Sequence, residues 1–455
     1  SQSSKGDTVP KPPACPDKVN VLLIGGGGRE HALGWKLKKS GRLGKLWIDA
    51  AKHGGLAPLG ECCPISTAGP FHEKSNDLFQ LRTWCDENNI QLVVVGPEIP
   101  LADGIHDALA TDTRLVFGPT ADGARLEADK AFAKQLMRSA NVPTADARMF
   151  TIAEDALEYV RAKDEPCVIK AAGLAAGKGV MICSTLAEAE EAITRVMVNR
   201  EFGDAGDTLL IEEMLSGPEV SILALTDGNS CWILDPAQDH KRVGEGDTGP
   251  NTGGMGAYCP APVLDEEQMA TVERDILVPI LDALKREGIV YRGVLYAGLM
   301  LTKAGPKVLE FNCRFGDPEC QPLLARLKGD IIKILWDTAA GNLANTTVEF
   351  DERPACCVVM CSEGYPGAYE KGKAIQGIEA AQQLGAAGEQ VIVFHAGTKH
   401  EGGELVTSGG RVLGVTALAK DLDRARALAN EACAAISFEG SFFRTDIGAK
   451  ASSEG

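Results

Sequence analysis

The sequence predicts a multidomain protein of mixed α/β and α+β class that begins with a doubly wound parallel sheet. The chain of 455 residues is too long for one ordinary hydrophobic core. From Val19 to about Gly118, short apolar segments alternate with amphipathic ones, which is the pattern of parallel strands joined by helices. Beyond that point, strand pairs with glycine-rich turns predominate, and a small α+β unit closes the chain.

The first strand, turn and helix are predicted within "VNVLLIGGGGREHALGWKL", Val19 to Leu37. A glycine-rich turn between a buried strand and a helix is where α/β proteins bind phosphate groups. The dinucleotide fingerprint G-x-G-x-x-G does not fit, because its third glycine falls on Glu30 or His31. A tight turn without a ligand is another alternative. We expect backbone N–H groups and charged side chains to bind an anion here. The candidate residues are Gly27, Gly28, Arg29 and Glu30.

The remaining elements of the first unit follow in order. We expect a strand at "KLWIDA", a helix over Leu78 to Asn88, and strands within "IQLVVVGPEIPLADG" and "RLVFGPT". A single helix from Ala124 to Ala140 then leads into the second unit. At the end of the chain, "VIVFHAGT", "RVLGVTALA" and a helix over Asp421 to Ile436 predict the α+β tail, with one apolar helix face in its core.

The second glycine-rich stretch lies in "PCVIKAAGLAAGKGVMIC", which predicts two strands joined by a turn. It is not a P-loop, because Lys178 is followed by Gly179 where a magnesium-binding Ser or Thr is required. We expect a hairpin flap that closes over phosphates with its N–H groups and Lys178, while Lys170 reaches the α or β phosphate. A mobile surface hairpin without a ligand is the alternative.

Two later strand ends carry further candidate ligands for a nucleotide. "IEEML" ends one of two strands in "DTLLIEEMLSGPEVSILALTDG", and Leu215 suits packing on an adenine ring, with Glu219 placed for ribose hydroxyls. In "LEFNCRFGDPE", Glu310 and Asn312 stand at i and i+2, so they share one face of a strand. Hard oxygen ligands in this arrangement suit Mg²⁺ that bridges phosphates.

Composition excludes several classes of function. The net charge of -17 argues against a general binder of nucleic acid or anionic membranes. We find neither a long apolar run nor a secretory leader, and we expect a soluble cytoplasmic protein. The fourteen cysteines include no C-x-x-C pair, so we expect reduced core thiols rather than disulfides or zinc ligands. The oligomeric state is expected to be a monomer or a weak homodimer.

The chain resembles the ATP-grasp superfamily in the order of its motifs: Lys130, Lys170, "GLAAGKGV", "IEEML", Glu219 and "LEFNCRFGDPE". Within that superfamily it is similar to the phosphoribosylamine–glycine ligase family through "GGGGREHALGWKL", "GPEIPLADG", "DHKRVGEGDTGPNTGGMGAYCPAP" and "NCRFGDPECQ". The resemblance covers about Val19 to Gly448. It implies ATP-dependent joining of glycine to 5-phosphoribosylamine through a glycyl phosphate, in purine synthesis, with Mg²⁺ or Mn²⁺ as the metal.

The resemblance also implies an ATP-grasp core with a small flap. We expect disordered tails at 1–18 and 450–455, a substrate-binding α/β domain at 19–120, and a C-terminal domain at 351–449. The central ATP-grasp domain is expected at 121–141 and 214–350, with the flap at 142–213. One departure concerns "KHGGLAPLG", Lys52 to Gly60, where the family usually has Gly-Asn-Ala-Gly. In another, Gly298 stands where many ATP-grasp enzymes have a metal-binding Glu.

The resemblance assigns site residues in four groups. The expected ATP ligands are Lys130, Lys170, Gly177, Lys178, Glu212, Glu213, Leu215 and Glu219. The expected catalytic residues are Lys178, Lys241 and Arg314, the last near the transferred phosphate or the glycine carboxylate. Those expected to bind phosphoribosylamine are Gly27, Gly28, Arg29, Glu30, Glu98, Asp317 and Arg411. The expected metal ligands are Glu310 and Asn312.

Three other functions are weighed against this one. A biotin-dependent carboxylase would share the ATP-grasp core, but the segment from Asp239 to Pro262 argues against it. An oxidoreductase is disfavoured because the dinucleotide fingerprint fails. A non-catalytic nucleotide-binding regulator is disfavoured because each expected phosphate-binding residue is present.

Overall fold

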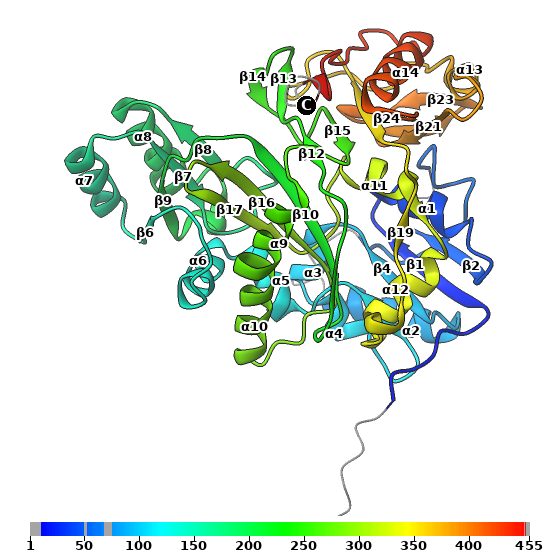
Figure 1. Cartoon of the computed structure of the whole chain (residues 1–455), viewed down its shortest axis with the longest axis horizontal. Coiled ribbons are helices and arrows are strands. Elements are labelled where there is room, and N and C mark those ends of the chain that lie inside the picture. The colour runs from blue at the N-terminus through cyan, green and yellow to red at the C-terminus, as the bar shows by residue number, and fades with distance from the viewer. Residues whose placement is uncertain (1–10, 50–51, 68–74, 450, 452–455) are drawn as a thin grey trace, which may run out of the picture.

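The computed structural model describes residues 11–49, 52–67, 75–449 and 451. Their strands form four sheets of four or five strands and three two-stranded ribbons (Figure 1). The first two large sheets use successive parts of the chain, whereas the strands of the other two are interleaved in the sequence. The predicted tail at 450–455 lies almost wholly outside the described residues, and so do residues 1–10. Residues 13–16 of the predicted N-terminal tail are packed, because Trp336 donates to the carbonyl of Pro13 and Arg42 donates to those of Cys15 and Pro16.

The N-terminal sheet confirms the predicted doubly wound unit. Its strands are all parallel, in the order β3-β2-β1-β4-β5. They are β1 Val19–Ile24, β2 Leu43–Ile48, β3 Glu61–Cys62, β4 Leu92–Val95 and β5 Leu115–Phe117. The helices are α1 Gly28–Leu37, α2 Ser75–Glu87, α3 Glu98–Ala102 and α4 Ile105–Leu109. The glycine-rich turn therefore lies at the carboxyl end of the central strand, where ligands of such sheets bind.

The single helix predicted over Ala124 to Ala140 is wrong, since two helices occupy this region. They are α5 Ala121–Ala128 and α6 Lys130–Ser139. Asp129 between them is extended, and its carboxylate accepts hydrogen bonds from the N–H groups of Ala131 and Phe132. This cap satisfies amide groups that the first turn leaves without partners, so the second helix begins anew and Lys130 becomes its first residue.

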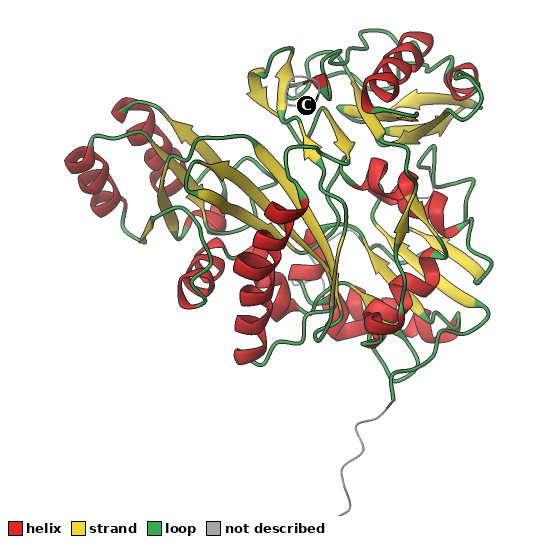
Figure 2. Ribbon diagram, in the orientation of Figure 1, coloured by secondary structure: helices red, strands yellow, loops and turns green. Residues whose placement is uncertain are grey.

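The flap is a separate antiparallel sheet in the order β6-β9-β7-β8. Its strands are β6 Ala147–Phe150, β7 Cys167–Ala171, β8 Val180–Cys183 and β9 Leu209–Glu213. Its helices are α7 Ala153–Lys163, α8 Leu186–Ile193, η2 Thr194–Val198 and η3 Gly203–Gly206. Figure 2 shows helices on the outer side of this sheet, and they share one small apolar core with it. The predicted hairpin with the glycine-rich turn is confirmed as β7 and β8.

The central sheet is antiparallel in the order β11-β10-β16-β17. Its strands are β10 Glu219–Thr226, β11 Cys231–Ile233, β16 Gly293–Thr302 and β17 Gly305–Asn312. The helical segments α9 Glu266–Val272, η4 Glu273–Leu277 and α10 Val278–Arg286 pack beside it (Figure 2). Gly298 of β16 lies opposite Glu310 of β17.

The C-terminal sheet has the order β12-β15-β20-β24-β21. Its strands are β12 Gln238–Asp239, β15 Gly256–Cys259, β20 Ala355–Cys361, β21 Gln390–His395 and β24 Arg411–Leu418. Strands from both sides of the expected boundary at 350/351 thus share one sheet. The segment from Asp239 to Pro262 runs through it and carries the ribbon of β13 Arg242–Gly244 and β14 Thr248–Asn251.

The other C-terminal elements cover this sheet and join it to the first one. They are α11 Cys320–Arg326, β18 Leu327–Lys328, α12 Ile331–Ala340, η5 Leu343–Asn345, β19 Glu349–Phe350, α13 Ile378–Gln382, β22 Thr398–Glu401, β23 Glu404–Thr407 and α14 Leu422–Ala435. The apolar face of α14 is buried, which confirms its place in the core. All fourteen cysteines are described and are free thiols, and eleven of them are buried.

The altered turn at 52–60 packs on the C-terminal domain. The N–H of Gly54 donates to the carbonyl of Thr398, and the backbone of His400 donates to Lys52. Inside the turn, Nδ1 of His53 accepts hydrogen bonds from the N–H groups of Gly55 and Leu56. This part of the chain therefore connects the first and last domains.

Candidate functional site

Two lysines lie between the flap and the central sheet. Nζ of Lys170, on β7, donates to the carbonyl of Leu309 on β17 at 2.9 Å. Nζ of Lys130, at the start of α6, donates to the carbonyls of Ala171 and Gly173 at 3.0 Å each. The structure thus brings together two of the predicted phosphate ligands, and Lys130 reaches this position because Asp129 restarts the helix.

The positive charges converge on Glu310. Nζ of Lys241 lies 3.9 Å from Oε1 of Glu310. Burial alone would raise the pKa of the Glu310 carboxyl. This pKa is instead held below its ordinary value by the positive charges of Lys241, Lys170, Lys130 and Arg314. The pKa of Lys241 is raised, first by Asp239 and then by Glu310. These basic residues therefore favour the ionised form of the Glu310 carboxyl group.

Glu310 and Asn312 provide the oxygen atoms of the expected metal site. A β-bulge in β17 at Leu309 precedes them, and both stand beyond it in register with Gly298 and Tyr296 of β16. Nη2 of Arg314 donates to Oδ1 of Asn312 at 3.4 Å. Among the described residues, no group of three or more His, Cys, Asp or Glu is placed to hold a metal ion. Two hard oxygen donors fit a magnesium ion whose other ligands are phosphates and water.

The tip of the flap hairpin carries Gly177 and Lys178. Gly177 has φ +75°, with open space where a Cβ would stand, and the Lys178 side chain is exposed. The N–H of Lys178 donates to Ala175 and closes the turn. Glu201 of the flap is the charged residue near Lys178. The pKa of Glu201 is lowered chiefly by its hydrogen bond with Arg195, and Lys178 makes the smallest contribution. The structure does not place Lys178 in contact with Lys170 or Glu310.

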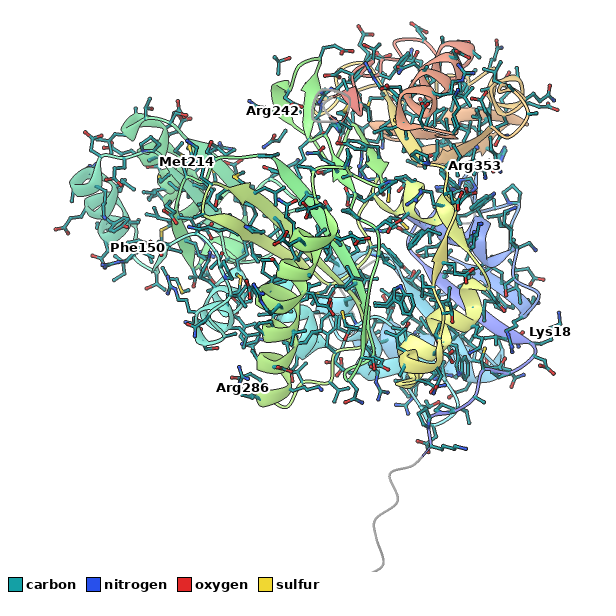
Figure 3. The ribbon with its side chains drawn as sticks, in the orientation of Figure 1. Lys18, Phe150, Met214, Arg242, Arg286 and Arg353 are labelled. Atoms are coloured by element: carbon teal, nitrogen blue, oxygen red, sulfur yellow. The ribbon has the colours of Figure 1, made fainter. Side chains whose placement is uncertain are left out.

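The strand end "IEEML" lies where the chain leaves the flap and includes Met214, which Figure 3 labels. The Glu212 carboxylate is buried and contacts Lys170 at 3.0 Å. Oε1 of Glu213 accepts the N–H of Asp146 at 3.0 Å. Leu215 is half-buried, and Glu219 is an exposed residue that begins β10. The side chain of Glu212 is thus directed toward the lysines.

Arg314 is held between two carboxylates. Its Nη2 lies 2.9 Å from Oε2 of Glu127, and its Nε lies 3.4 Å from Oε2 of Glu98. The second oxygen of Glu127 accepts the N–H of Cys313 at 2.9 Å. Arg314 and Arg29 lower the pKa of Glu98 against the effect of burial. A small cavity beside this cluster is lined by Glu98, Leu101, Ala124, Glu127, Ala128, Leu174 and Cys313.

The glycine-rich turn encloses its own ion pair. Nε of Arg29 lies 2.6 Å from Oε2 of Glu30, and Nη1 donates to the carbonyl of Phe315 at 3.1 Å. A Cβ on Gly25 or on Gly96 would meet the Glu30 side chain within 3 Å, so both positions leave room for it. Both charged side chains are therefore directed inward. The N–H of Gly27 donates to Oε1 of Glu30 at 3.3 Å, so anion binding by the backbone of Gly27 and Gly28 stays a prediction.

Asp317 connects this turn to the C-terminal domain. Its Oδ2 accepts the N–H of Arg29 at 3.4 Å, and its Oδ1 lies 3.9 Å from Nη1 of Arg411. Against the effect of burial, Arg411 and Arg29 lower the pKa of Asp317. Nη1 of Arg411 also donates to the carbonyl of Asp317 at 3.0 Å. Arg29, Asp317 and Arg411 therefore meet, although they come from three distant segments of the chain.

Three buried charged residues of this region were not predicted. Glu127 holds Arg314, Lys134 contacts Glu212, and Glu319 follows Asp317 in the "GDPE" stretch. Burial and the nearby Asp239 carboxylate raise the pKa of Glu319 to about 8. For Lys134 and Glu127, a charged residue on the apolar side of a predicted helix was the only available signal.

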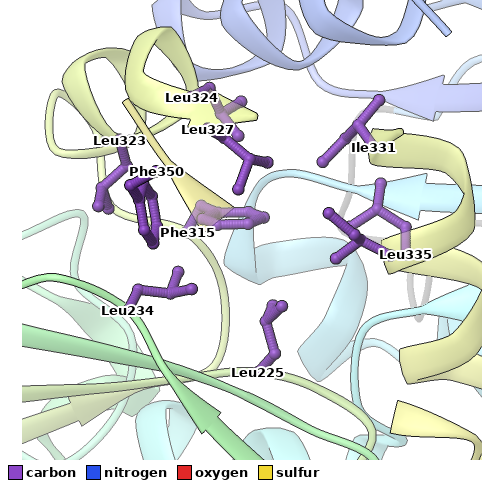
Figure 4. Close-up of a pocket in the computed structure, with 10 residues that line it drawn as sticks. Leu225, Leu234, Phe315, Leu323, Leu324, Leu327, Ile331, Leu335 and Phe350 are labelled. Atoms are coloured by element: carbon purple, nitrogen blue, oxygen red, sulfur yellow. The ribbon is translucent and has the colours of Figure 1, made fainter. Parts of the chain in front are cut away.

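A second cavity is entirely apolar and is not a candidate for this chemistry (Figure 4). It lies between the central sheet and helices α11 and α12, and no polar side chain lines it. Its lining residues are Leu225, Leu234, Phe315, Leu323, Leu324, Leu327, Ile331, Ile334, Leu335 and Phe350.

A hinged flap above an antiparallel sheet, with two lysines and an acidic strand end between them, defines an ATP-grasp protein. Biotin carboxylase of Hydrogenobacter thermophilus 2-oxoglutarate carboxylase shares this fold, with a TM-score of 0.70 and 18% identity over 93% of this chain and 91% of that one. Family profiles for phosphoribosylglycinamide synthetase match three regions: the N domain at 19–127, the ATP-grasp domain at 128–320 and the C domain at 355–450. The chain belongs to this family.

Individual relatives agree with this assignment. Phosphoribosylamine–glycine ligase of Rhodopirellula baltica is 52% identical over 441 residues, which cover 95% of this chain and 98% of the relative. The trifunctional purine biosynthetic protein adenosine-3 of Homo sapiens is 46% identical, and the match spans 42% of its length. A crystal structure of the Thermotoga maritima phosphoribosylamine–glycine ligase superposes with a TM-score of 0.77 at 30% identity, over 94% of this chain and all of that one.

In the part of the chain that the structure describes, we find no helix with the length and apolar character needed to cross a membrane.

Proposed function

We propose that this protein joins glycine to 5-phosphoribosylamine, using ATP, and releases glycinamide ribonucleotide, ADP and phosphate. The observation that carries the proposal is the position of Lys130 and Lys170 between the flap and the central sheet, with Lys241 3.9 Å from the Glu310 carboxylate. Several basic side chains in one site suit transfer of a phosphoryl group, which requires charge neutralisation more than covalent help. The full-length relatives that carry the ligase name support the choice of substrates.

The reaction proceeds in two steps. The carboxylate of glycine is a poor electrophile, so one of its oxygens first attacks the γ-phosphorus of ATP and ADP leaves. The amine of phosphoribosylamine then attacks the carbonyl carbon of the glycyl phosphate. The C–N bond forms, the C–O bond to phosphate breaks, and the nitrogen loses one proton. Because glycyl phosphate hydrolyses in bulk water, the site must exclude water between the two steps.

The proposed roles follow the geometry. Lys130 and Lys170 neutralise ATP phosphates beneath the flap, Gly177 and Lys178 close over them, and Glu213, Leu215 and Glu219 border the nucleoside. Arg314 and Lys241 neutralise the transferred phosphoryl group. The backbone of Gly27 and Gly28 binds the phosphate or ribose of phosphoribosylamine, while Glu98, Asp317 and Arg411 bind the rest of this substrate. We propose that Arg29 and Glu30 support that turn from inside.

Glu310 and Asn312 would hold Mg²⁺, or Mn²⁺. When bound, this ion supplies additional positive charge to the β and γ phosphates. We also propose a monomer or weak homodimer and a cytoplasmic location, which the composition suggests.

The test is to measure ADP release with glycine and freshly made phosphoribosylamine together, and with each omitted in turn. We expect full turnover only with both substrates. Trapping with hydroxylamine in the absence of phosphoribosylamine should give glycine hydroxamate. ADP release that requires bicarbonate instead would favour a carboxylase, and ADP release that needs neither amine nor glycine would contradict the proposal.

A further inference from the structure

A buried cluster of three charged residues lies at the base of the flap. Nζ of Lys134, on α6, is 3.3 Å from Oε1 of Glu212, and Nζ of Lys170 is 3.0 Å from Oε2 of the same carboxylate. These side chains are 2%, 4% and 8% exposed in the order Lys134, Glu212, Lys170. Two ammonium groups therefore share one carboxylate, and the cluster carries one net positive charge.

Lys134 also bonds to the hinge of the flap. The chain passes between the central domain and the flap sheet twice, once before β6 and once between β9 and β10. Nζ of Lys134 donates to Oγ1 of Thr144 at 2.8 Å and to the carbonyl of Ala145 at 3.0 Å, both on the first crossing. Glu212, its ion-pair partner, is the second-last residue of β9, next to the second crossing. Lys134 thus contacts both connections of the flap.

We propose that Lys134 is a positioning residue that neutralises Glu212 and thereby leaves the charge of Lys170 available to the phosphates of a bound nucleotide. Without Lys134, the carboxylate of Glu212 would pair with Lys170 alone, and the net charge of this cluster would fall from one to zero. A buried carboxylate without its second partner would hold Lys170 more firmly, because buried charges interact in a low dielectric. The phosphates of a nucleotide would then have to displace it.

This inference rests on the proposed function only in that Lys170 contacts a nucleotide phosphate. Binding of Mg-ADP without glycine or phosphoribosylamine therefore tests it, independently of the ligation assay. Burial lowers the pKa of Lys134, and the adjacent Glu212 carboxylate opposes this change. The binding of Mg-ADP is measured at neutral pH. Lys285 is exposed on α10 and provides the control for loss of one positive charge.

The experiment compares Lys134→Met, the double variant Lys134→Met/Glu212→Gln, and Lys285→Met by calorimetric titration with Mg-ADP. We expect Lys134→Met to raise the Kd about ten- to thirtyfold, the effect of roughly one charge-assisted hydrogen bond. Glu212→Gln alone is titrated as the reference, because Glu212 is itself an expected ATP ligand, and the double variant should bind within about threefold of Glu212→Gln. Lys285→Met should bind like the wild type.

The double variant distinguishes electrostatic positioning from a structural role. If it binds about tenfold more weakly than Glu212→Gln alone, Lys134 acts only as part of the hinge, and the proposal is overturned. An unchanged Kd for Lys134→Met also overturns it. Should Lys134→Met fail to fold by circular dichroism, Lys134→Gln removes the charge but keeps a donor, and the same restoration by Glu212→Gln is required.

Discussion

Replacing Arg29 by Met tests whether the first glycine-rich turn is held together by its own ion pair. The substitution keeps the length of the side chain and removes its charge. In the structure the Arg29 and Glu30 side chains are 9% and 3% exposed, and their closest atoms are 2.6 Å apart. The variant would therefore leave the Glu30 carboxylate buried and without its cation, and the carbonyl of Phe315 with Arg314 as its remaining side-chain donor.

The magnitude follows from this burial. Removing one partner of a buried ion pair costs about 3 to 5 kcal/mol, since the remaining charge is desolvated without compensation. A second substitution, Glu30→Gln, removes that charge, and the Arg29→Met/Glu30→Gln variant should recover more than half of the loss. Gly25 and Gly96 leave the same space for a glutamine side chain.

The measurements are urea denaturation followed by circular dichroism and the KM for phosphoribosylamine. We expect the single variant to lower the midpoint of unfolding, and to raise this KM while the KM values for ATP and glycine change little. Both effects should recover in the double variant. If Arg29 instead bonds directly to the substrate phosphate, the KM should rise about ten- to 150-fold in both variants while the midpoint stays unchanged. That result would refute an internal role for Arg29.

The other predictions concern the nucleotide, the metal and one buried lysine. Lys170→Ala and Lys178→Ala should each lose ATP-dependent turnover and keep the wild-type circular dichroism spectrum; unchanged kcat in both would remove the flap from the mechanism. Glu310→Gln and Asn312→Ala should raise the Mg²⁺ concentration needed for half-maximal rate, and a titration that superposes on the wild type would argue against this metal site. Burial lowers the pKa of Lys36 to about 8, below its value in the unfolded chain. The charged form of Lys36 therefore destabilises the folded protein below pH 8, and the free energy of unfolding should rise between pH 8 and about 10.5. Lys36→Met should stabilise the protein at pH 7 and remove this rise, as seen by urea midpoints across that range.

Sequence patterns predicted those elements of the fold that interactions between neighbouring residues determine. The apolar run at Val19 to Ile24 and the glycines after it specify a strand and a turn, because neither choice requires distant partners. The hairpin around Lys178 follows from two short apolar runs with glycine between them. The alignment with ATP-grasp enzymes placed Gly298 on the strand before Glu310, and the structure adds the register that pairs the two residues.

The parts that were missed depend on partners distant in the sequence. The helix break at Asp129 fixes Lys130 beside Ala172, forty-two residues later, and the helical pattern is continuous across it. Glu127 and Arg314 are separated by 187 residues, so no spacing rule could pair them. The sequence suggested that Arg29 extends toward a ligand, and the structure shows that its nearest carboxylate is the adjacent Glu30.

Glycine has a different structural role in each of the two glycine-rich turns. At the first, Gly25 and Gly96 make room for the Glu30 side chain, and the ion pair with Arg29 makes this turn rigid. At the second, Gly177 has a positive φ and open space around it, and Lys178 is exposed. A rigid turn suits a substrate that must meet a reactive intermediate in one geometry, whereas a mobile tip suits phosphates that enter and leave in each cycle. Substituting Gly25 should therefore reduce stability and substrate binding together, whereas substituting Gly177 should cost only the backbone strain of its positive φ and should change turnover more than stability.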